Sequence, residues 1–266
     1  MSVRRFAHCI VRQISPSFQY ALTLNTRKEP INIALAHQQH KAYVEVLRKL
    51  IPNLIELPGE PDFPDCCFVE DTVVVIGQNA LLCRPGAPQR RGEVDSIEAV
   101  LRKIPLQQVI RAEEPVLIDG GDVLFTGSRI LVGISKRTNK HAVKQLEKVF
   151  PYPIIPIRVL EGLHLKSVVT CYADDRFVVA SNSAGDFAKK ELENIDSSYD
   201  IIRVPDAVPS NVIRIGNALL VQEGFPESES VFKQLASKEN LDLIFLNMSE
   251  LIKADGALTC CSVMVE

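Results

Sequence analysis

The sequence predicts an α/β fold built as a closed ring of five repeated units, and three observations lead to that prediction. One pattern recurs five times: an apolar strand, a polar loop, a hairpin of two strands and, in most copies, a helix. The hairpins begin at regular intervals of 50, 45, 44 and 51 residues, near Val73, Val123, Val168, Val212 and Val263. The last copy lacks its second hairpin strand and its helix, and the N-terminal segment supplies both. Chain ends that complete one unit predict a five-bladed α/β propeller of repeated ββαβ modules with fivefold pseudosymmetry, formed by residues 1–266 as a single domain.

Each element of the repeat follows from local sequence. We expect helices near 32–50, 91–104, 138–150, 184–195 and 227–239. In these segments apolar residues recur on one helix face, as Val94, Ile97 and Leu101 do, so we interpret these stripes as core. The hairpin turns are marked by GQNA, TGSR, ADDR and IGNA, because Gly, Asn and Asp tolerate the backbone of a chain reversal.

Composition excludes several classes of protein. The net charge is -3 and charged residues make up 24%, with no long basic run, so we expect neither nucleic acid nor an anionic membrane as a partner. No segment approaches the roughly 20 apolar residues of a membrane span, and no signal peptide precedes the first strand. The seven cysteines contain no CxxC pair, which argues against a disulfide framework or a zinc ribbon. We therefore expect a soluble cytosolic protein with free thiols and a small-molecule partner, as a monomer or a homodimer.

A propeller brings the residues just ahead of each hairpin together at the common axis. In this chain those residues include a thiol, an imidazole and four carboxylates. The full set is Glu70, Asp71, Asp119, Asp122, His164, Lys166, Ser210, Asn211 and Cys260. This combination is typical of a catalytic site.

Cys260 is the candidate nucleophile of this set. A cysteine in an apolar strand is most often a small core residue, but here Cys260 and Cys261 are neighbours. Successive strand side chains point to opposite faces, so we expect Cys260 to face the axis and Cys261 the core. An ordinary thiol is mostly protonated at neutral pH, so the nucleophile needs a base or a nearby positive charge. His164 is the only histidine at a converging position, and Gly162 precedes it.

The acids around the axis suggest two further roles. An Asp-Gly-Gly-Asp sequence can be only a tight turn, but its position makes Asp119 a candidate to orient His164, while Asp122 is expected to support the turn. Glu70 and Asp71 enter an apolar strand, where burying two acids is costly. A cation supplied from outside would offset that cost.

The sequence resembles the dimethylarginine dimethylaminohydrolase family of the guanidino-group-modifying superfamily. The resemblance rests on PDCCFVEDT, RPGAPQRR, DGGDVLFTG, SKRTN, GLHLKS and DGALTCCSV, which occur in the family's order along the whole chain. It implies a five-bladed pentein-type propeller that uses no metal or organic cofactor.

The resemblance also implies a role for each site residue. The implied nucleophile, general acid and base, and orienting acid are Cys260, His164 and Asp119. The guanidinium of the substrate would be bound by Asp71 with Glu70 and Asp65. The α-carboxylate would lie near Arg90 and Arg137, and the α-ammonium near the Ala254 carbonyl and Asp255, while Leu22 would lie in a loop that covers the pocket.

The implied reaction is hydrolysis of asymmetric dimethylarginine and monomethylarginine to citrulline through a covalent thiouronium. Asymmetric dimethylarginine and monomethylarginine inhibit nitric oxide synthase, so the resemblance implies that their removal regulates that enzyme. An arginine deiminase is the nearest rival, but deiminases carry an acid two residues after the catalytic histidine, where this chain has Lys166. A non-catalytic methylarginine-binding protein is a rival of another class. Cys260 and His164 are also expected to be able to bind Zn²⁺ as an inhibitor.

Overall fold

The computed structural model describes residues 4–24 and 29–266 and contains five three-stranded sheets. The strands are β1 (His8–Arg12), β2 (Asn53–Leu57), β3 (Val73–Ile76), β4 (Asn79–Leu82), β5 (Gln108–Arg111), β6 (Val123–Phe125), β7 (Ile130–Ile134), β8 (Ile154–Arg158), β9 (Val169–Ala173), β10 (Arg176–Ala180), β11 (Asp200–Val204), β12 (Ile213–Ile215), β13 (Ala218–Gln222), β14 (Asp242–Leu246) and β15 (Val263–Val265). The α-helices are α1 (Ile33–Leu50), α2 (Glu93–Leu101), α3 (His141–Val149), α4 (Ser183–Ile195), α5 (Pro226–Glu239) and α6 (Ser249–Ile252).

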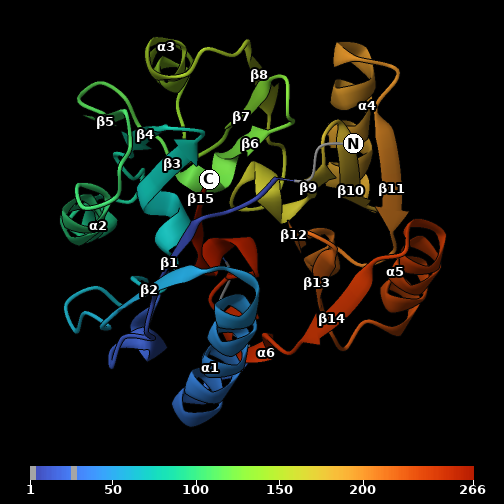
Figure 1. Ribbon diagram of the computed structural model, residues 1–266, viewed down its shortest axis with the longest axis horizontal. Coiled ribbons are helices and arrows are strands. Elements are labelled where there is room, and N and C mark those ends of the chain that lie inside the picture. The colour runs from blue at the N-terminus through green and yellow to red at the C-terminus, as the bar shows by residue number, and fades with distance from the viewer. Residues whose placement is uncertain (1–3, 25–28) are drawn as a thin grey trace.

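The sheets are the blades of a propeller around one axis (Figure 1). In each blade an inner strand pairs antiparallel with the middle strand, and the outer strand adds in parallel after a helical crossover, as in β3-β4-β5. Parallel addition needs such a crossover because the chain must return to the same end of the sheet. The predicted ββαβ repeat is therefore confirmed.

The two ends of the chain together form the fifth blade. β15 pairs antiparallel with β1, with His8 opposite Val265 and Ile10 opposite Val263, and β1 pairs in parallel with β2. Figure 1 shows the blue N-terminal strand beside the red C-terminal strand. The prediction that the N-terminal segment completes the last repeat is confirmed.

The helices begin where capping chemistry permits. The Asn32 side chain accepts a hydrogen bond from the Leu35 N–H at the start of α1, and Asn182 does the same for Gly185 at the start of α4. All five expected crossover helices are present, but α2 and α3 are shorter than predicted at both ends. Among the helices of the described residues, none is both long and apolar enough to cross a membrane.

The apolar cores lie between neighbouring blades. One core, for example, joins Ile10 of β1 and Val263 of β15 to Val73 of β3 and to the α2 residues Val94 and Ile97. Because the cores fill the spaces between blades, the axis itself is left to polar residues.

A short 3₁₀ turn precedes each inner strand and faces the axis. These turns are η2 (Val69–Thr72), η4 (Gly120–Asp122), η5 (Leu165–Ser167), η6 (Val208–Ser210) and η7 (Thr259–Cys261). One expectation was wrong: Cys260 and Cys261 lie in η7 and not in the strand, which begins at Val263. The turns bring together the residues that the repeat alignment expected at the axis.

Candidate active site

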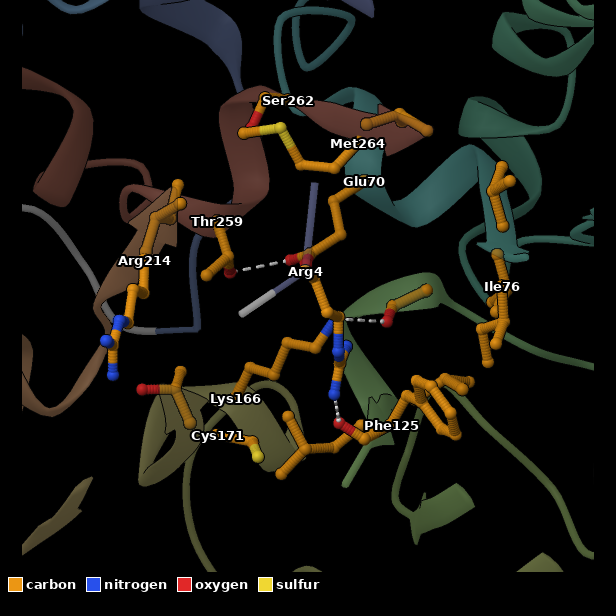
Figure 2. A pocket seen from close by; sticks show the side chains of 18 of the residues that line it. Arg4, Glu70, Ile76, Phe125, Lys166, Cys171, Arg214, Thr259, Ser262 and Met264 are labelled. Atoms are coloured by element: carbon orange, nitrogen blue, oxygen red, sulfur yellow. Dashed lines mark hydrogen bonds and ion pairs between the residues drawn. The ribbon is translucent and has the colours of Figure 1, made fainter. Parts of the chain in front are cut away.

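Two cavities lie on either side of the ring of 3₁₀ turns. The smaller, of about 40 Å³, is lined by Asp71, His164 and Cys260. The larger, of about 210 Å³, is lined by the inner strands and by Glu70 and Lys166 (Figure 2). Cys260 lines only the smaller of these two cavities, whereas the cysteine of the larger one is Cys171, so the candidate active site is the smaller cavity.

His164 is held by Asp119. The His164 Nε2 atom lies 2.9 Å from Asp119 Oδ2, and both side chains are buried. The other oxygen of Asp119 accepts a hydrogen bond from the Gly86 N–H at 2.8 Å. The Asp119 N–H donates to Thr138 Oγ1 at 3.1 Å, which fixes the backbone of the same residue. Gly86 and Thr138, which are distant in sequence, thus hold Asp119 in place, and Asp119 in turn orients the His164 imidazole.

Asp71 lies beside this pair and is buried as well. Its Oδ1 atom is 3.7 Å from His164 Nε2 and accepts the Gly121 N–H at 3.1 Å, while Oδ2 accepts Arg90 Nη1 at 2.6 Å. Burial would raise the pKa of Asp71, but the charges of His164 and Arg90 outweigh burial and lower that pKa to about 2. Burial would likewise lower the pKa of His164, and Asp71 and Asp119 instead raise it to about 9. The imidazole is therefore protonated at neutral pH in the unliganded site.

The two glycines of the DGGD sequence are required by close approach. A Cβ at Gly121 would lie 2.7 Å from His164 Nδ1 and 2.9 Å from Asp71 Oδ1. A Cβ at Gly120 would lie 2.0 Å from the Glu70 carbonyl oxygen. All three distances are shorter than a real Cβ allows, so only glycine lets the imidazole and the carboxylate approach this turn.

Cys260 faces the smaller cavity, while Cys261 is fully buried in the apolar core between blades. Their different directions were predicted, but the reason given for them was wrong. Strand alternation does not apply in a 3₁₀ turn, where three residues per turn separate adjacent side chains by about 120°. Burial raises the pKa of the Cys260 thiol, and the charges of Glu70 and Asp71 raise it further. The resting thiol is therefore neutral.

Arg90 is bound more tightly by the protein than expected. Its Nε and Nη2 atoms donate to Glu93, Nη2 also donates to the Phe68 carbonyl at 2.9 Å, and Nη1 donates to Asp71. Its side chain and that of Glu93 are buried. Glu93 was not predicted as a site residue, although an acid three residues after Arg90 at a helix start was a usable signal. Arg90 lines the cavity, as predicted, with most of its donors already engaged.

Arg137 has a buried donor atom, Nη1, that makes no hydrogen bond among the described residues. The facing acid is Asp119, whose Oδ2 atom lies 3.6 Å away. Arg137 also lines the smaller cavity, so its guanidinium adds a positive charge to the cavity wall.

The loop that carries Leu22 covers the cavity and is held at two points. The Leu22 N–H donates to Asp65 Oδ1 at 3.0 Å, and the Leu24 N–H donates to Asp255 Oδ2 at 2.6 Å. Ala254 lines the same cavity, as do the apolar side chains of Phe68 and Leu163, which were not predicted. The cavity volume of about 40 Å³ holds only a few waters.

Glu70 is the predicted site residue that the structure places elsewhere. Its carboxylate accepts Lys166 Nζ at 2.6 Å and Thr259 Oγ1 at 2.9 Å, and it lines the larger cavity instead of the smaller one. The Glu70 side chain is thus not among the lining residues of the smaller cavity, and its contact with a guanidinium stays a prediction. Adjacent residues of a 3₁₀ turn cannot point the same way, so Asp71 faces one cavity and Glu70 the other.

Asp122 supports the turns, as predicted. It accepts the Leu165 N–H at 2.8 Å and the Ser135 hydroxyl at 2.6 Å. Oxygen or nitrogen atoms of Asp71, Asp119 and His164 lie within 4.8 Å of one another and could approach a metal ion. Within the described residues Cys260 is not a member of that cluster, so the expected zinc pair of Cys260 and His164 stays a prediction.

The comparisons with known proteins agree with this geometry. The family described as N,N dimethylarginine dimethylhydrolase, eukaryotic, matches residues 12–263. An N(G),N(G)-dimethylarginine dimethylaminohydrolase of Streptomyces coelicolor is 31% identical over 96% of this chain and 95% of its own, and one of Pseudomonas aeruginosa is 29% identical over 97% and 99%. The solved structure of a cysteine-to-serine variant of the Pseudomonas aeruginosa enzyme, complexed with citrulline, superposes with a TM-score of 0.88 and 27% identity, covering 98% of this chain and 100% of that one. This chain belongs to the eukaryotic dimethylarginine dimethylaminohydrolase family.

Proposed function

We propose that the chain is a cysteine hydrolase of Nω-methylated arginines. It converts asymmetric dimethylarginine or monomethylarginine to citrulline, with release of dimethylamine or methylamine. The observation that carries the proposal is the single cavity in which a buried His164–Asp119 pair, a buried carboxylate at Asp71 and the Cys260 thiol meet, in a chain of this family. These are the groups that nucleophilic attack on a guanidinium carbon requires.

The first half-reaction breaks the bond to the methylated nitrogen. The substrate guanidinium binds beside Asp71, and its positive charge favours the thiolate form of Cys260. The thiolate attacks the guanidinium carbon, and the resulting tetrahedral carbon expels the methylated nitrogen. The protonated His164 donates its proton to that nitrogen, so a neutral amine leaves and a covalent thiouronium remains.

The second half-reaction consumes one water. His164, now neutral, takes a proton from the water, and the hydroxide adds to the thiouronium carbon. As this second tetrahedral carbon collapses, the C–S bond breaks and the hydroxyl proton passes to the departing sulfur, which restores the neutral Cys260 thiol and forms the ureido group of citrulline. The roles of His164 as acid and then base follow from its raised pKa and its bond to Asp119.

The other cavity residues are proposed to bind the rest of the substrate. The place of Arg137 in the cavity wall, with an Nη1 atom that makes no hydrogen bond among the described residues, supports a contact with the α-carboxylate, with Arg90 as the second cation nearby. Asp255 and the Ala254 carbonyl bind the α-ammonium once the Leu24 N–H releases Asp255. Phe68 and Leu163 provide the apolar wall against which methyl groups can pack.

The geometry does not favour an arginine deiminase. Lys166, which occupies the position of the deiminase acid, forms an ion pair with Glu70 and lines the larger cavity. The smaller cavity therefore has no carboxylate at that position to bind the unmethylated nitrogen of arginine.

Citrulline formation by the purified protein, offered asymmetric dimethylarginine and arginine in parallel, tests the proposal. We expect citrulline and dimethylamine in equal amounts from the methylated substrate and little product from arginine. A Cys260→Ser variant should bind the substrate but release no citrulline. Citrulline chiefly from arginine would make the protein a deiminase, and none from either substrate would leave a methylarginine-binding protein.

We further propose that residues 1–266 act as one catalytic unit, because the fifth blade needs both chain ends. The reaction is proposed to need no added metal or organic cofactor, so activity should survive chelation. A cytosolic location is supported by seven free cysteines. In cells with nitric oxide synthase, hydrolysis of methylarginines would relieve inhibition of that enzyme.

A further inference from the structure

The turns that carry the residues of the candidate site also place side chains on the side of the larger cavity. The residues on the side of the smaller cavity are Asp71, His164 and Cys260. Their neighbours on the side of the larger cavity are Glu70, Lys166 and Thr259. Each of the three turns therefore contributes one residue to the proposed chemistry and one to the layer behind it.

The layer behind the site is a closed ring of hydrogen bonds, which we name the axial belt and define as Glu70, Lys166, Asn211 and Thr259. Lys166 Nζ donates to Glu70 Oε1 at 2.6 Å, and Thr259 Oγ1 donates to Glu70 Oε2 at 2.9 Å (Figure 2). Asn211 Nδ2 closes the ring by donating to Thr259 Oγ1 at 2.9 Å and to the Lys166 carbonyl at 3.1 Å. Lys166 Nζ also donates to the Gly120 carbonyl at 3.2 Å. The belt thus connects the turn regions of all five blades.

Asn211 holds Thr259 at two points. Its Oδ1 atom accepts the Thr259 N–H at 2.9 Å, while its Nδ2 atom bonds to the Thr259 hydroxyl. The Asn211 side chain is 2% exposed and uses both its donor and its acceptor atoms within the belt. Thr259 directly precedes Cys260, so this amide fixes the peptide that carries the thiol.

We propose that Asn211 and Thr259 are positioning residues. They fix the position of the Cys260 turn relative to the Glu70–Lys166 ion pair and so set the reactivity of the thiol. The inference rests on the proposed function, because it assigns both residues to the reaction of Cys260. Neither side chain lines the cavity in which the substrate binds, so both act through Cys260 and Glu70.

The effect is electrostatic as well as geometric. The charged or titratable groups around Cys260 are Glu70 and Asp71 on η2, Lys166 on η5, His164 before η5, Cys261 on η7, and the cavity residues Asp65, Arg90, Arg137 and Asp255. Glu70 opposes thiolate formation, and Lys166 favours it. The Thr259 hydroxyl donates to the carboxylate and so helps to stabilise its charge. Without that donor, the Glu70 carboxylate keeps its bond to Lys166 but loses the bond that fixes it relative to the thiol.

The matched variants Thr259→Val and Thr259→Ser test the proposal, because valine keeps the shape without the hydroxyl and serine keeps the hydroxyl. We expect Thr259→Val to lower kcat by about 10- to 100-fold with KM within about twofold, and Thr259→Ser to recover most of the activity. A second measurement is the pH dependence of Cys260 alkylation by iodoacetamide, followed by mass spectrometry with Cys260→Ser as the blank. Its midpoint should move to higher pH in Thr259→Val and stay near the wild-type value in Thr259→Ser.

Equal kcat and equal alkylation midpoints in the two variants would overturn the proposal. If Thr259→Val does not fold, Asn211→Asp provides the same test, since it loses both Nδ2 donors and adds a negative charge near Cys260. An unchanged midpoint in Asn211→Asp would also overturn it. Alkylation does not depend on turnover, so a wild-type protein that makes no citrulline would contradict the proposed function and leave the alkylation comparison intact.

Discussion

Replacing Asp119 by Asn should lower the pKa of His164 and show how much of the proposed mechanism depends on this carboxylate. Asp119 accepts hydrogen bonds at both oxygens, from His164 Nε2 at 2.9 Å and from the Gly86 N–H at 2.8 Å. An amide has one acceptor and one donor end, so Asn cannot accept from both neighbours. Either the Gly86 N–H or the imidazole loses its partner, and the imidazolium loses a negative charge.

The size of the effect follows from the charges in the site. His164 has a pKa of about 9 against an ordinary value of 6.5. A charge-assisted hydrogen bond contributes roughly 1.5–3 kcal/mol, which corresponds to about one to two pKa units. The remaining charge of Asp71 lies 3.7 Å from Nε2 and keeps the pKa above 6.5. The His164 pKa in Asp119→Asn should therefore fall to between about 7 and 8.

The same shift predicts a pH dependence of stability. Because the folded pKa of His164 exceeds its unfolded value of 6.5, the contribution is fully present below pH 6.5 and is lost as the pH rises through about 9. The wild-type contribution is roughly 3 kcal/mol, and in Asp119→Asn it should be about 1–2 kcal/mol and disappear at lower pH. Above about pH 10 the part of the stability difference that is linked to His164 should vanish.

Two measurements check this prediction. NMR titration of the His164 imidazole gives the pKa directly, and urea unfolding between pH 6 and 10 gives the linked stability. We also expect kcat to fall by about 100-fold or more, since the amide cannot hold the imidazole in the orientation in which it protonates the leaving amine. A His164 pKa within about half a unit of the wild-type value would refute the claim that Asp119 sets the charge of the imidazole.

Three further predictions concern the same cavity. Gly121→Ala should lower kcat by about 100-fold, because the new Cβ would lie 2.7 Å from His164 Nδ1; near-normal activity would mean that the turn relaxes easily. Arg137→Met should raise KM by about tenfold or more with a smaller change in kcat, whereas an unchanged KM would remove Arg137 from the α-carboxylate site. Zn²⁺ should slow alkylation of Cys260 in the wild type, and a chelator should restore the original rate. The protection by Zn²⁺ should be weaker in His164→Ala, and protection that does not depend on His164 would contradict a shared zinc site.

The fold was predictable because its repeats are visible in the sequence. Five hairpins at nearly equal spacing indicate five blades, and Val263 and His8 lie in strands that could only pair if the ring closes. The convergence of Asp71, Asp119 and His164 followed from the same alignment of repeats. Symmetry thus revealed long-range contacts that local propensity alone does not contain.

The directions of individual side chains were not predictable in the same way. Asp71 and Glu70 are adjacent acids with the same local pattern, yet Asp71 faces the candidate site and Glu70 belongs to the axial belt on the opposite side. That choice depends on a 3₁₀ turn, whose three-residue period has no signature in so short a segment. The bond from Arg90 to Asp71 was also missed, although the β3-β4 hairpin brings the segments before and after it to the same end of the blade.

The protonation of the resting site restricts the order of steps in the proposed mechanism. At neutral pH His164 is protonated and the Cys260 thiol is neutral, since their pKa values are both raised. An imidazolium cannot accept the thiol proton, so His164 cannot be the base that activates Cys260. In the proposed mechanism the proton therefore passes to solvent when the substrate cation enters, before the C–S bond forms. His164 then keeps its own proton for the departing amine, which is the state that the first half-reaction requires.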